Sequence, residues 1–161
     1  MLSHGLGISR IIAQVLINRG IDTVEGAAGF LDPSSANLLS PWELKNMPAA
    51  VERVRQAVRN KEKVLIFGDY DVDGLTSVAL IKTHLEQRGL SVDYYIPNRI
   101  SDGYGLNSQV SDAARKSGST LVITVDCGIN SFSVINELKH KGIDTIITDH
   151  HEPSIPDLPS A

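Results

Sequence analysis

The chain contains one cysteine among its 161 residues, and this scarcity excludes two classes of small protein. A single thiol cannot form an internal disulfide framework, and it leaves no cysteine-rich zinc site. Because disulfides belong to oxidising compartments, a chain without them is expected in a reducing setting. We therefore expect a cytoplasmic location.

Long apolar runs and an excess of positive charge are also missing. No apolar stretch approaches the roughly 20 residues that cross a bilayer, so no membrane partner is expected. The N-terminus has no basic segment followed by a continuous apolar block, so no secretory signal is expected either. The formal net charge of −4 argues against a broad basic surface for nucleic acid. Nucleic acid stays open as a substrate, because catalytic carboxylates add to the acidic count and bound metals reverse the local field.

The remaining composition, 42% hydrophobic and 21% charged, is ordinary for a globular domain with a sizeable core. In the first 60 residues, apolar side chains recur at helical spacing. The pattern predicts helices over about 8–19, within 21–31 and over 48–60, which together form a helical N-terminal region, residues 1–62. The third helix carries a basic face that we interpret as solvated surface, with contact to a phosphate backbone as the alternative.

The apolar pattern changes at Lys63, where short apolar runs begin to alternate with helical patterns. Strands are predicted over 64–67, 91–96, 120–125 and 144–148, and helices over 75–88, 108–116 and 131–141. This alternation predicts an α/β fold, a parallel sheet with helices on both faces, over residues 63–151. Residues 152–161 form a proline-rich tail that leads to further parts. Right-handed crossovers place the carboxyl ends of all the strands at one edge, where such sheets bind ligands.

Polar residues with metal-binding side chains follow three of the predicted strands. They are Asp69, Asp71 and Asp73 after the first strand, Asp126 after the third, and Asp149, His150 and His151 after the fourth. In extended backbone the alternate aspartates point to one side, and a hard divalent cation is the simplest way to relieve their repulsion. An Asp/Gly turn is the alternative for one such group. Three groups at one sheet edge favour a Mn²⁺ or Mg²⁺ site, with two ions about 3.5–4 Å apart acting on a phosphate ester.

Four sequence motifs carry a resemblance to a known family. DYDVDG (69–74), PNRISDGYGLN (97–107), VDCG (125–128) and TDHH (148–151) resemble the DHH phosphoesterase superfamily. Within it, the DYDVDG form and the GYGLN loop are typical of the RecJ family of bacterial exonucleases specific for single-stranded DNA. INRGI (17–21) and FLDPS (30–34) are similar to the helical region that precedes the catalytic core of that family.

The resemblance implies hydrolysis of single-stranded DNA in the 5′→3′ direction, in DNA repair and recombination, with two Mn²⁺ ions, or Mg²⁺ in some members. It also implies single-strand-binding protein or a helicase as partners. Four residues would be metal ligands, namely Asp71, Asp73, Asp126 and His150. The catalytic residues would be His151, beside the scissile phosphate, and Asp69, which supports the ligands. The motif loop would bind substrate through Arg99, Gly103, Tyr104, Gly105 and Asn107, with a purely structural turn as the alternative.

Members of this family are several times longer than this chain, and they carry a further metal-binding aspartate and more domains after the DHH motif. We therefore expect the chain to be the N-terminal part of such an enzyme, with weak or no exonuclease activity by itself. Two alternatives stay open, and a third is disfavoured. The chain could be a DHH phosphodiesterase for oligonucleotides, cyclic dinucleotides or pyrophosphate, or a non-catalytic fragment that binds nucleic acid or a partner. A response-regulator-like domain is disfavoured by the paired histidines. Cys127 is expected to be a small filler near the metals.

Overall fold

The computed structural model describes residues 2–32, 34, 38–98, 100, 103, 105–154 and 158–161 of the chain. The chain divides into two compact units, Met1–Met47 and Pro48–Ala161. Within the described residues, no helix combines the length and the apolar character needed to span a membrane.

The first unit is helical, as the sequence predicts, and consists of α1 (Leu2–Leu6), α2 (Arg10–Asn18) and α3 (Val24–Leu31), followed by the short 3₁₀ helix η2 (Pro41–Glu43). Polar caps begin two of these helices: Ser9 Oγ accepts from the Ile12 N–H, and Thr23 Oγ1 accepts from the Gly26 N–H. A small core holds the helices together through Leu2, Ala13, Leu16 and Ala27.

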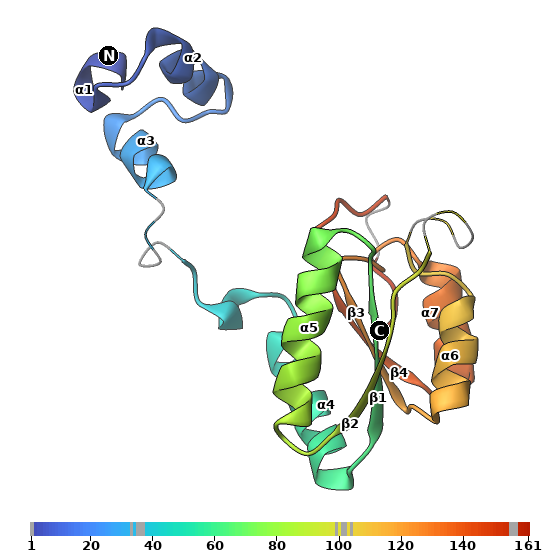
Figure 1. The fold of residues 1–161 in the computed structure, drawn as a ribbon. Coiled ribbons are helices and arrows are strands. Elements are labelled where there is room, and N and C mark those ends of the chain that lie inside the picture. Colours follow the sequence, from blue (N-terminus) through green and yellow to red (C-terminus); the bar gives the residue numbers. More distant parts are fainter. Residues whose placement is uncertain are drawn as a thin grey trace. The chain divides into compact units, whose positions relative to one another are not determined.

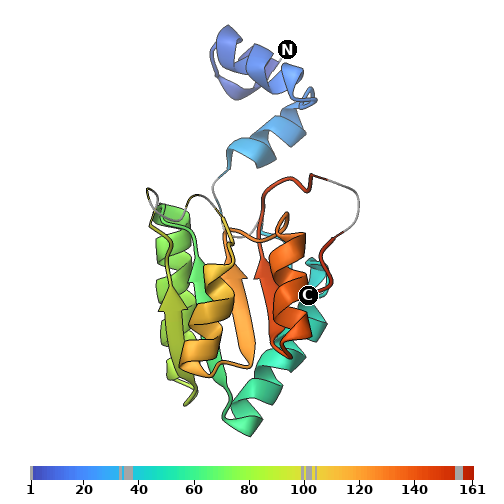
Figure 2. The same ribbon diagram turned by 90° about the vertical axis from the view of Figure 1, so that its right-hand side faces the viewer.

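The second unit is an α/β structure. Its elements in order are α4 (Met47–Asn60), β1 (Lys63–Gly68), α5 (Val72–Glu86), β2 (Ser91–Tyr95), α6 (Gln109–Ser117), β3 (Leu121–Val125), α7 (Phe132–His140) and β4 (Asp144–Thr148). The strands form one parallel sheet in the order β2-β1-β3-β4. The predicted fold class is therefore confirmed, and the strand arrows in Figure 2 point toward the same edge of the sheet.

Helices cover both faces of the sheet: α4 and α5 lie on one face, and α6 and α7 on the other (Figure 1). The central strand β1 shows why, because its alternate side chains point to opposite faces. Val64 and Ile66 belong to the core beneath α4 and α5, whereas Leu65 and Phe67 belong to the core beneath α6 and α7. A strand that is buried on both faces needs apolar residues at successive positions, and this pattern at Val64–Phe67 predicted the strand β1.

The order of the strands locates the ligand-binding edge. From β1 the chain passes first to β2 on one side and later to β3 on the other side, so the sheet changes its direction of growth between β1 and β3. Gly68 at the end of β1 is in register with Val125 at the end of β3. The segments that begin at Asp69 and Asp126 therefore leave the sheet side by side, at the switch point where open α/β sheets bind ligands.

The expectation that Asp69, Asp71 and Asp73 point to one side of an extended segment is wrong. Helix α5 begins at Val72 rather than Leu75, because Asp71 is its N-cap and accepts hydrogen bonds from the backbone N–H groups of Asp73 and Gly74. Asp69 is buried, whereas Asp71 and Asp73 are exposed. The Asp/Gly turn, which was the alternative prediction for this motif, therefore forms at Asp71–Gly74 as the beginning of helix α5.

The basic face of α4 makes ion pairs within the chain. Arg53 Nη2 lies 2.7 Å from Glu62 Oε2, and Arg53 Nε lies 2.6 Å from Asp144 Oδ2 at the start of β4. Glu62 Oε2 also accepts a hydrogen bond of 2.6 Å from Thr120 Oγ1, just before β3. Arg59 pairs with Glu52 on the same helix. The Arg53–Glu62 pair therefore joins α4 to the amino-terminal edge of the sheet.

Replacing Glu62 with glutamine should lower the free energy of unfolding by about 1–2 kcal/mol at pH 7, because the hydrogen bonds that the carboxylate accepts from Arg53 and Thr120 are weakened in a partly exposed setting. Hydrogen bonds from Arg53 and Thr120 hold the pKa of Glu62 below its ordinary value of 4.5. The stabilisation is thus complete above about pH 4.5 and is lost as the pH falls through the lower folded-state pKa. Urea denaturation at pH 7 and pH 3 measures this, with the exposed Glu43→Gln as control. A difference between parent and variant that persists unchanged at pH 3 would contradict it.

Candidate metal centre

Asp126 is held in an unusual backbone conformation at the end of β3. Its φ of 60° lies in the left-handed region, which aspartate tolerates better than most residues. Its N–H donates to the Thr148 carbonyl at 2.9 Å, so the pairing of β3 with β4 continues for one more residue. Its side chain is only 7% exposed. Such conformations concentrate at functional sites, where the surrounding structure enforces them.

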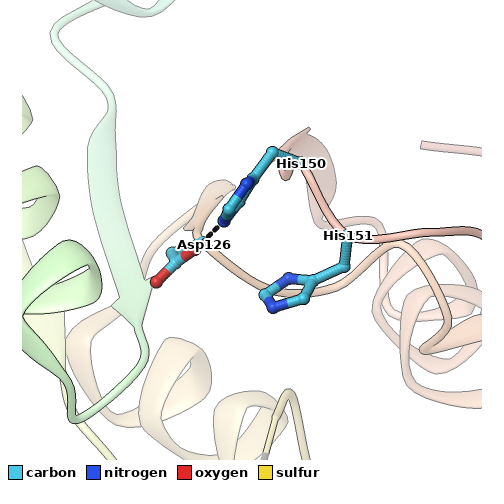
Figure 3. A group of neighbouring side chains, drawn as sticks. All are labelled: Asp126, His150 and His151. Carbon is cyan, nitrogen blue, oxygen red and sulfur yellow. Dashed lines mark hydrogen bonds and ion pairs between the residues drawn. The ribbon is translucent and has the colours of Figure 1, made fainter. Parts of the chain in front are cut away.

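The two histidines after β4 come together with Asp126. Potential ligand atoms of Asp126, His150 and His151 all lie within 4.8 Å of one another. His150 Nε2 is 3.0 Å from Asp126 Oδ1, the contact marked in Figure 3. The rings of His150 and His151 are tilted against each other, with their centroids 4.8 Å apart. One carboxylate and two imidazoles in this arrangement form a donor set that can hold a divalent transition-metal ion.

Asp149 orients His151. Its carboxylate is 2% exposed, and its Oδ1 atom lies 2.7 Å from His151 Nδ1 and accepts from the His151 N–H, while Oδ2 accepts from the Ile129 N–H. Although burial raises the pKa of Asp149, these hydrogen bonds outweigh it and lower the pKa. The same contact raises the pKa of His151. With Nδ1 engaged by Asp149, Nε2 is the ring atom that His151 can turn toward a ligand.

The sequence gives Asp149 no separate role, although its position at a strand end places it in the predicted group. The missing information was its hydrogen-bonding pattern, because Ile129 is brought to it by the tertiary fold. The Asp-His-His spacing itself was the available signal, since a histidine that binds metal commonly hydrogen-bonds a carboxylate through its other nitrogen.

Two carboxyl groups follow the ends of β1 and β3. Asp71 and Asp126 lie near enough for each to affect the pKa of the other. Burial raises the pKa of Asp126, and the neighbouring charge of Asp71 raises it further. The pKa of Asp71 is lowered, chiefly by the hydrogen bond from the Gly74 N–H. Because neighbouring carboxylates repel each other, the pair fits a divalent cation bound between them.

Asp69 provides a second observation that fits a cation. The residue is 1% exposed, and its Oδ1 accepts from the Tyr70 N–H at 2.7 Å. Its Oδ2 is buried and has no hydrogen-bond partner within the described part of the chain. A buried carboxylate oxygen without a partner is costly. A metal ion is the kind of partner that such an oxygen takes.

The other predicted site residues do not belong to the Asp126–His150–His151 group among the residues that the structure describes. Asp73 is exposed in the first turn of α5 and, among the described residues, lies outside the Asp126–His150–His151 group. Asn107 Oδ1 accepts from the Gln109 N–H at the start of α6, and this contact helps to begin that helix. Gly103 and Gly105 have φ near 80°, a conformation that favours glycine. Arg99 and Tyr104 lie outside the described residues.

A cavity of about 370 Å³ lies beside His151. Its lining residues are Gly105, Leu106, Cys127, Gly128, Ile129, Asn130, Ser131, Asp149, His151 and Glu152. The volume is at the lower end of the range of small-ligand sites, about 300–1,000 Å³. Burial, followed by the charges of Asp149, Asp69 and Asp126, raises the pKa of the Cys127 thiol to about 12. A thiol protonated at neutral pH is a poor nucleophile, in agreement with a filler role for Cys127.

A parallel sheet with carboxylates and imidazoles gathered at its switch point defines a class of α/β proteins with potential metal ligands at the strand ends. The chain belongs to the DHH family, because the family model "DHH family, N-terminal domain" matches residues 63–161.

Three similar proteins extend this result. The single-stranded-DNA-specific exonuclease RecJ of Bacillus subtilis (strain 168) is 42% identical over 158 residues, which cover 98% of this chain and 20% of the relative. A crystal structure of exonuclease RecJ bound to manganese has a TM-score of 0.69 and 34% identity, over 76% of this chain and 31% of the other. RecJ from Thermus thermophilus in complex with Mn²⁺ has a TM-score of 0.67 and 29% identity, over 99% of this chain and 22% of the other. The chain thus spans about a fifth of the length of its B. subtilis relative.

Proposed function

We propose that this chain is the N-terminal part of the catalytic core of a RecJ-type exonuclease, which hydrolyses single-stranded DNA in the 5′→3′ direction with two Mn²⁺ or Mg²⁺ ions. The observation that carries the proposal is the convergence of Asp126, His150 and His151 at the edge of the sheet. The unpartnered, buried Oδ2 of Asp69 at the same edge, within the described part of the chain, supports it. The names of the relatives support the choice of substrate, and the bound metals of the two solved structures support the choice of ion.

The metal ions would be held by Asp71, Asp73, Asp126 and His150, with Asp69 Oδ2 available as a further ligand. When bound, the ions supply Lewis acidity and an activated water. His151 is oriented by Asp149 and lines the cavity, where it can hold a proton for the leaving oxygen or stabilise charge on the phosphate.

The substrate would lie along the loop of residues 97–107. Arg99 would bind phosphate, Tyr104 and Asn107 would contact the nucleotide, and Gly103 and Gly105 would let the backbone approach closely. We propose a cytoplasmic setting and, as protein partners, single-strand-binding protein or a helicase. Residues 63–151 would be the part of the DHH domain present in this chain, and 152–161 its continuation.

The proposal is tested with a 5′-labelled single-stranded oligonucleotide and Mn²⁺, comparing the parent chain with an Asp71→Ala, Asp73→Ala double variant. We expect the parent to bind Mn²⁺ in calorimetry and to release nucleotides slowly at most, because the chain spans a fifth of its relative. The double variant should bind Mn²⁺ at least roughly tenfold more weakly and release nothing, since two carboxylate ligands are gone. Equal Mn²⁺ affinity in both proteins, or equal cleavage by both, would contradict the proposed site.

A DHH phosphodiesterase for short substrates is the second candidate, and the 370 Å³ cavity beside His151 is the observation in its favour, since it is large enough to hold one nucleotide unit. Substrate length separates the two functions. Faster cleavage of a dinucleotide or cyclic dinucleotide than of a long single strand would favour this candidate over the exonuclease.

A further inference from the structure

The loop that carries the two histidines is held at both of its ends. At the upstream end, the Asp126 N–H bonds the carbonyl of Thr148, the last residue of β4. At the downstream end, the side-chain amide of Asn130 makes two contacts with backbone: Nδ2 donates to the Glu152 carbonyl at 3.2 Å, and Oδ1 accepts from the Ser154 N–H at 2.6 Å. A backbone N–H can bond only the amide oxygen, and a carbonyl only the NH₂ group, so the chemistry defines the orientation of the amide.

The Asn130 side chain therefore acts as a substitute for a strand partner. In a parallel ladder, one residue bonds a carbonyl and an N–H two positions apart on the neighbouring strand. Here those two positions are Glu152 and Ser154, on either side of Pro153, which has no N–H to offer. The adjacent Ile129 N–H bonds Asp149, the residue that orients His151. Residues 126–130 thus contact the segment 148–154 near both of its ends, and the two histidines lie between these contacts.

His150 depends on this support. Its side chain is 73% exposed, and its ring is held by the contact to Asp126 and by the neighbouring ring of His151. No regular secondary structure follows β4 within the described residues, so backbone pairing does not restrain the loop beyond Thr148. Without Asn130, the 150–154 backbone would lose this downstream contact. The His150 imidazole would then sample positions away from Asp126 and from the ring of His151, which Asp149 still holds.

We propose that Asn130 is a positioning residue for the candidate metal centre, and that its double contact to Glu152 and Ser154 sets how tightly the site binds Mn²⁺. This inference rests on the proposed metal-binding function. Residues that hold metal ligands in place without touching the ion typically change metal affinity by about 10–100-fold.

The first test is Mn²⁺ affinity of the full chain, measured by calorimetry and by the electron paramagnetic resonance of the free ion. Asn130→Ala should bind Mn²⁺ about 10–100-fold more weakly than the parent, with a similar melting temperature. Asn130→Gln keeps both polar groups on a longer stem and should recover part of the affinity. Asn60→Ala is the matched control, because its amide also makes a side-chain contact, to Glu62, but outside the site. It should bind Mn²⁺ like the parent.

The second test needs no metal. The chain has five histidines, and their imidazole resonances can be followed by nuclear magnetic resonance in the metal-free protein. Asn130→Ala should shift or broaden those of His150 and His151 and leave those of His4, His84 and His140 unchanged. Parent-like resonances for all of them in this variant would overturn the inference, whether or not the parent binds Mn²⁺. If the parent binds Mn²⁺ and Asn130→Ala binds it equally well, the inference fails while the proposed function stands.

Discussion

Gly74→Ala is expected to destabilise the second unit by about 3 kcal/mol, because the added methyl group meets backbone that cannot move aside. A Cβ at position 74 would lie 2.3 Å from the Asp69 carbonyl oxygen and 2.6 Å from the Asp69 backbone nitrogen. Both are backbone atoms at the end of β1, so no side-chain rotation can relieve the contact. Helix α5 would have to move away from the strand.

The intrinsic preference of the residue acts in the opposite direction. Alanine is favoured over glycine within a helix by about 1 kcal/mol, so a clash that merely offset this preference would leave stability unchanged. Asp71, which caps α5, and Asp69 flank the same contact, so the movement should also weaken Mn²⁺ binding. Urea denaturation followed by circular dichroism measures the first effect, and calorimetry with Mn²⁺ measures the second.

Gly29→Ala is the matched control for this substitution. Gly29 lies in helix α3, and a Cβ there would meet nothing within 4 Å. Its replacement should leave stability unchanged or raise it by up to about 1 kcal/mol. If Gly74→Ala behaved like Gly29→Ala, the close packing of α5 against the end of β1 would be refuted.

Asp126→Asn is expected to weaken Mn²⁺ binding by about 100-fold or more, while the metal-free protein becomes more stable at pH 7. The loss follows because the central carboxylate of the Asp126–His150–His151 group is removed, which costs more than the removal of a supporting residue. The gain follows because burial and the charge of Asp71 raise the pKa of Asp126, so its ionised form is disfavoured in the folded, metal-free protein. Opposite changes in binding and stability are typical of a residue kept for function.

The stability of the metal-free protein should depend on pH through Asp126. A folded-state pKa raised above the unfolded value means that ionisation of Asp126 lowers stability as the pH rises through the folded pKa. The melting temperature of Asp126→Asn without metal should therefore exceed that of the parent at pH 7, and the difference should shrink as the pH falls toward 3.8, the ordinary pKa of aspartate. Added Mn²⁺ should raise the melting temperature of the parent more than that of the variant.

Asp112→Asn is the control, because Asp112 is exposed on α6 and pairs only loosely with Arg115, at 3.6 Å. Both measurements should match the parent within error. An Asp126→Asn protein that bound Mn²⁺ with parental affinity would remove Asp126 from the metal centre. One that was less stable without metal would show that the carboxylate supports the fold.

The α/β architecture could be predicted from the sequence for a simple physical reason. Strands buried on both faces need apolar residues at every position, as in Val64–Phe67, and amphipathic helices need them at every third or fourth position. The two patterns are local, so the order of elements and the parallel sheet follow from them. The start of α5 could not be predicted in this way, because Asp71 both caps a helix and carries a motif carboxylate, and only the structure shows the cap.

The chemical groups that reach the carboxyl edge of the sheet follow from the sequence, because they stand just after strands: Asp69 after β1, Asp126 after β3, and the histidine pair after β4 and Asp149. The contacts among them depend on the tertiary structure. The register of Gly68 with Val125 places the segments of Asp71 and Asp126 side by side, and hydrogen bonds from Ile129 and Asn130 orient the loop that carries the histidines. Local pattern specifies elements and their ends, whereas contacts between ends depend on strand order and loop packing, which bring together residues far apart in the chain.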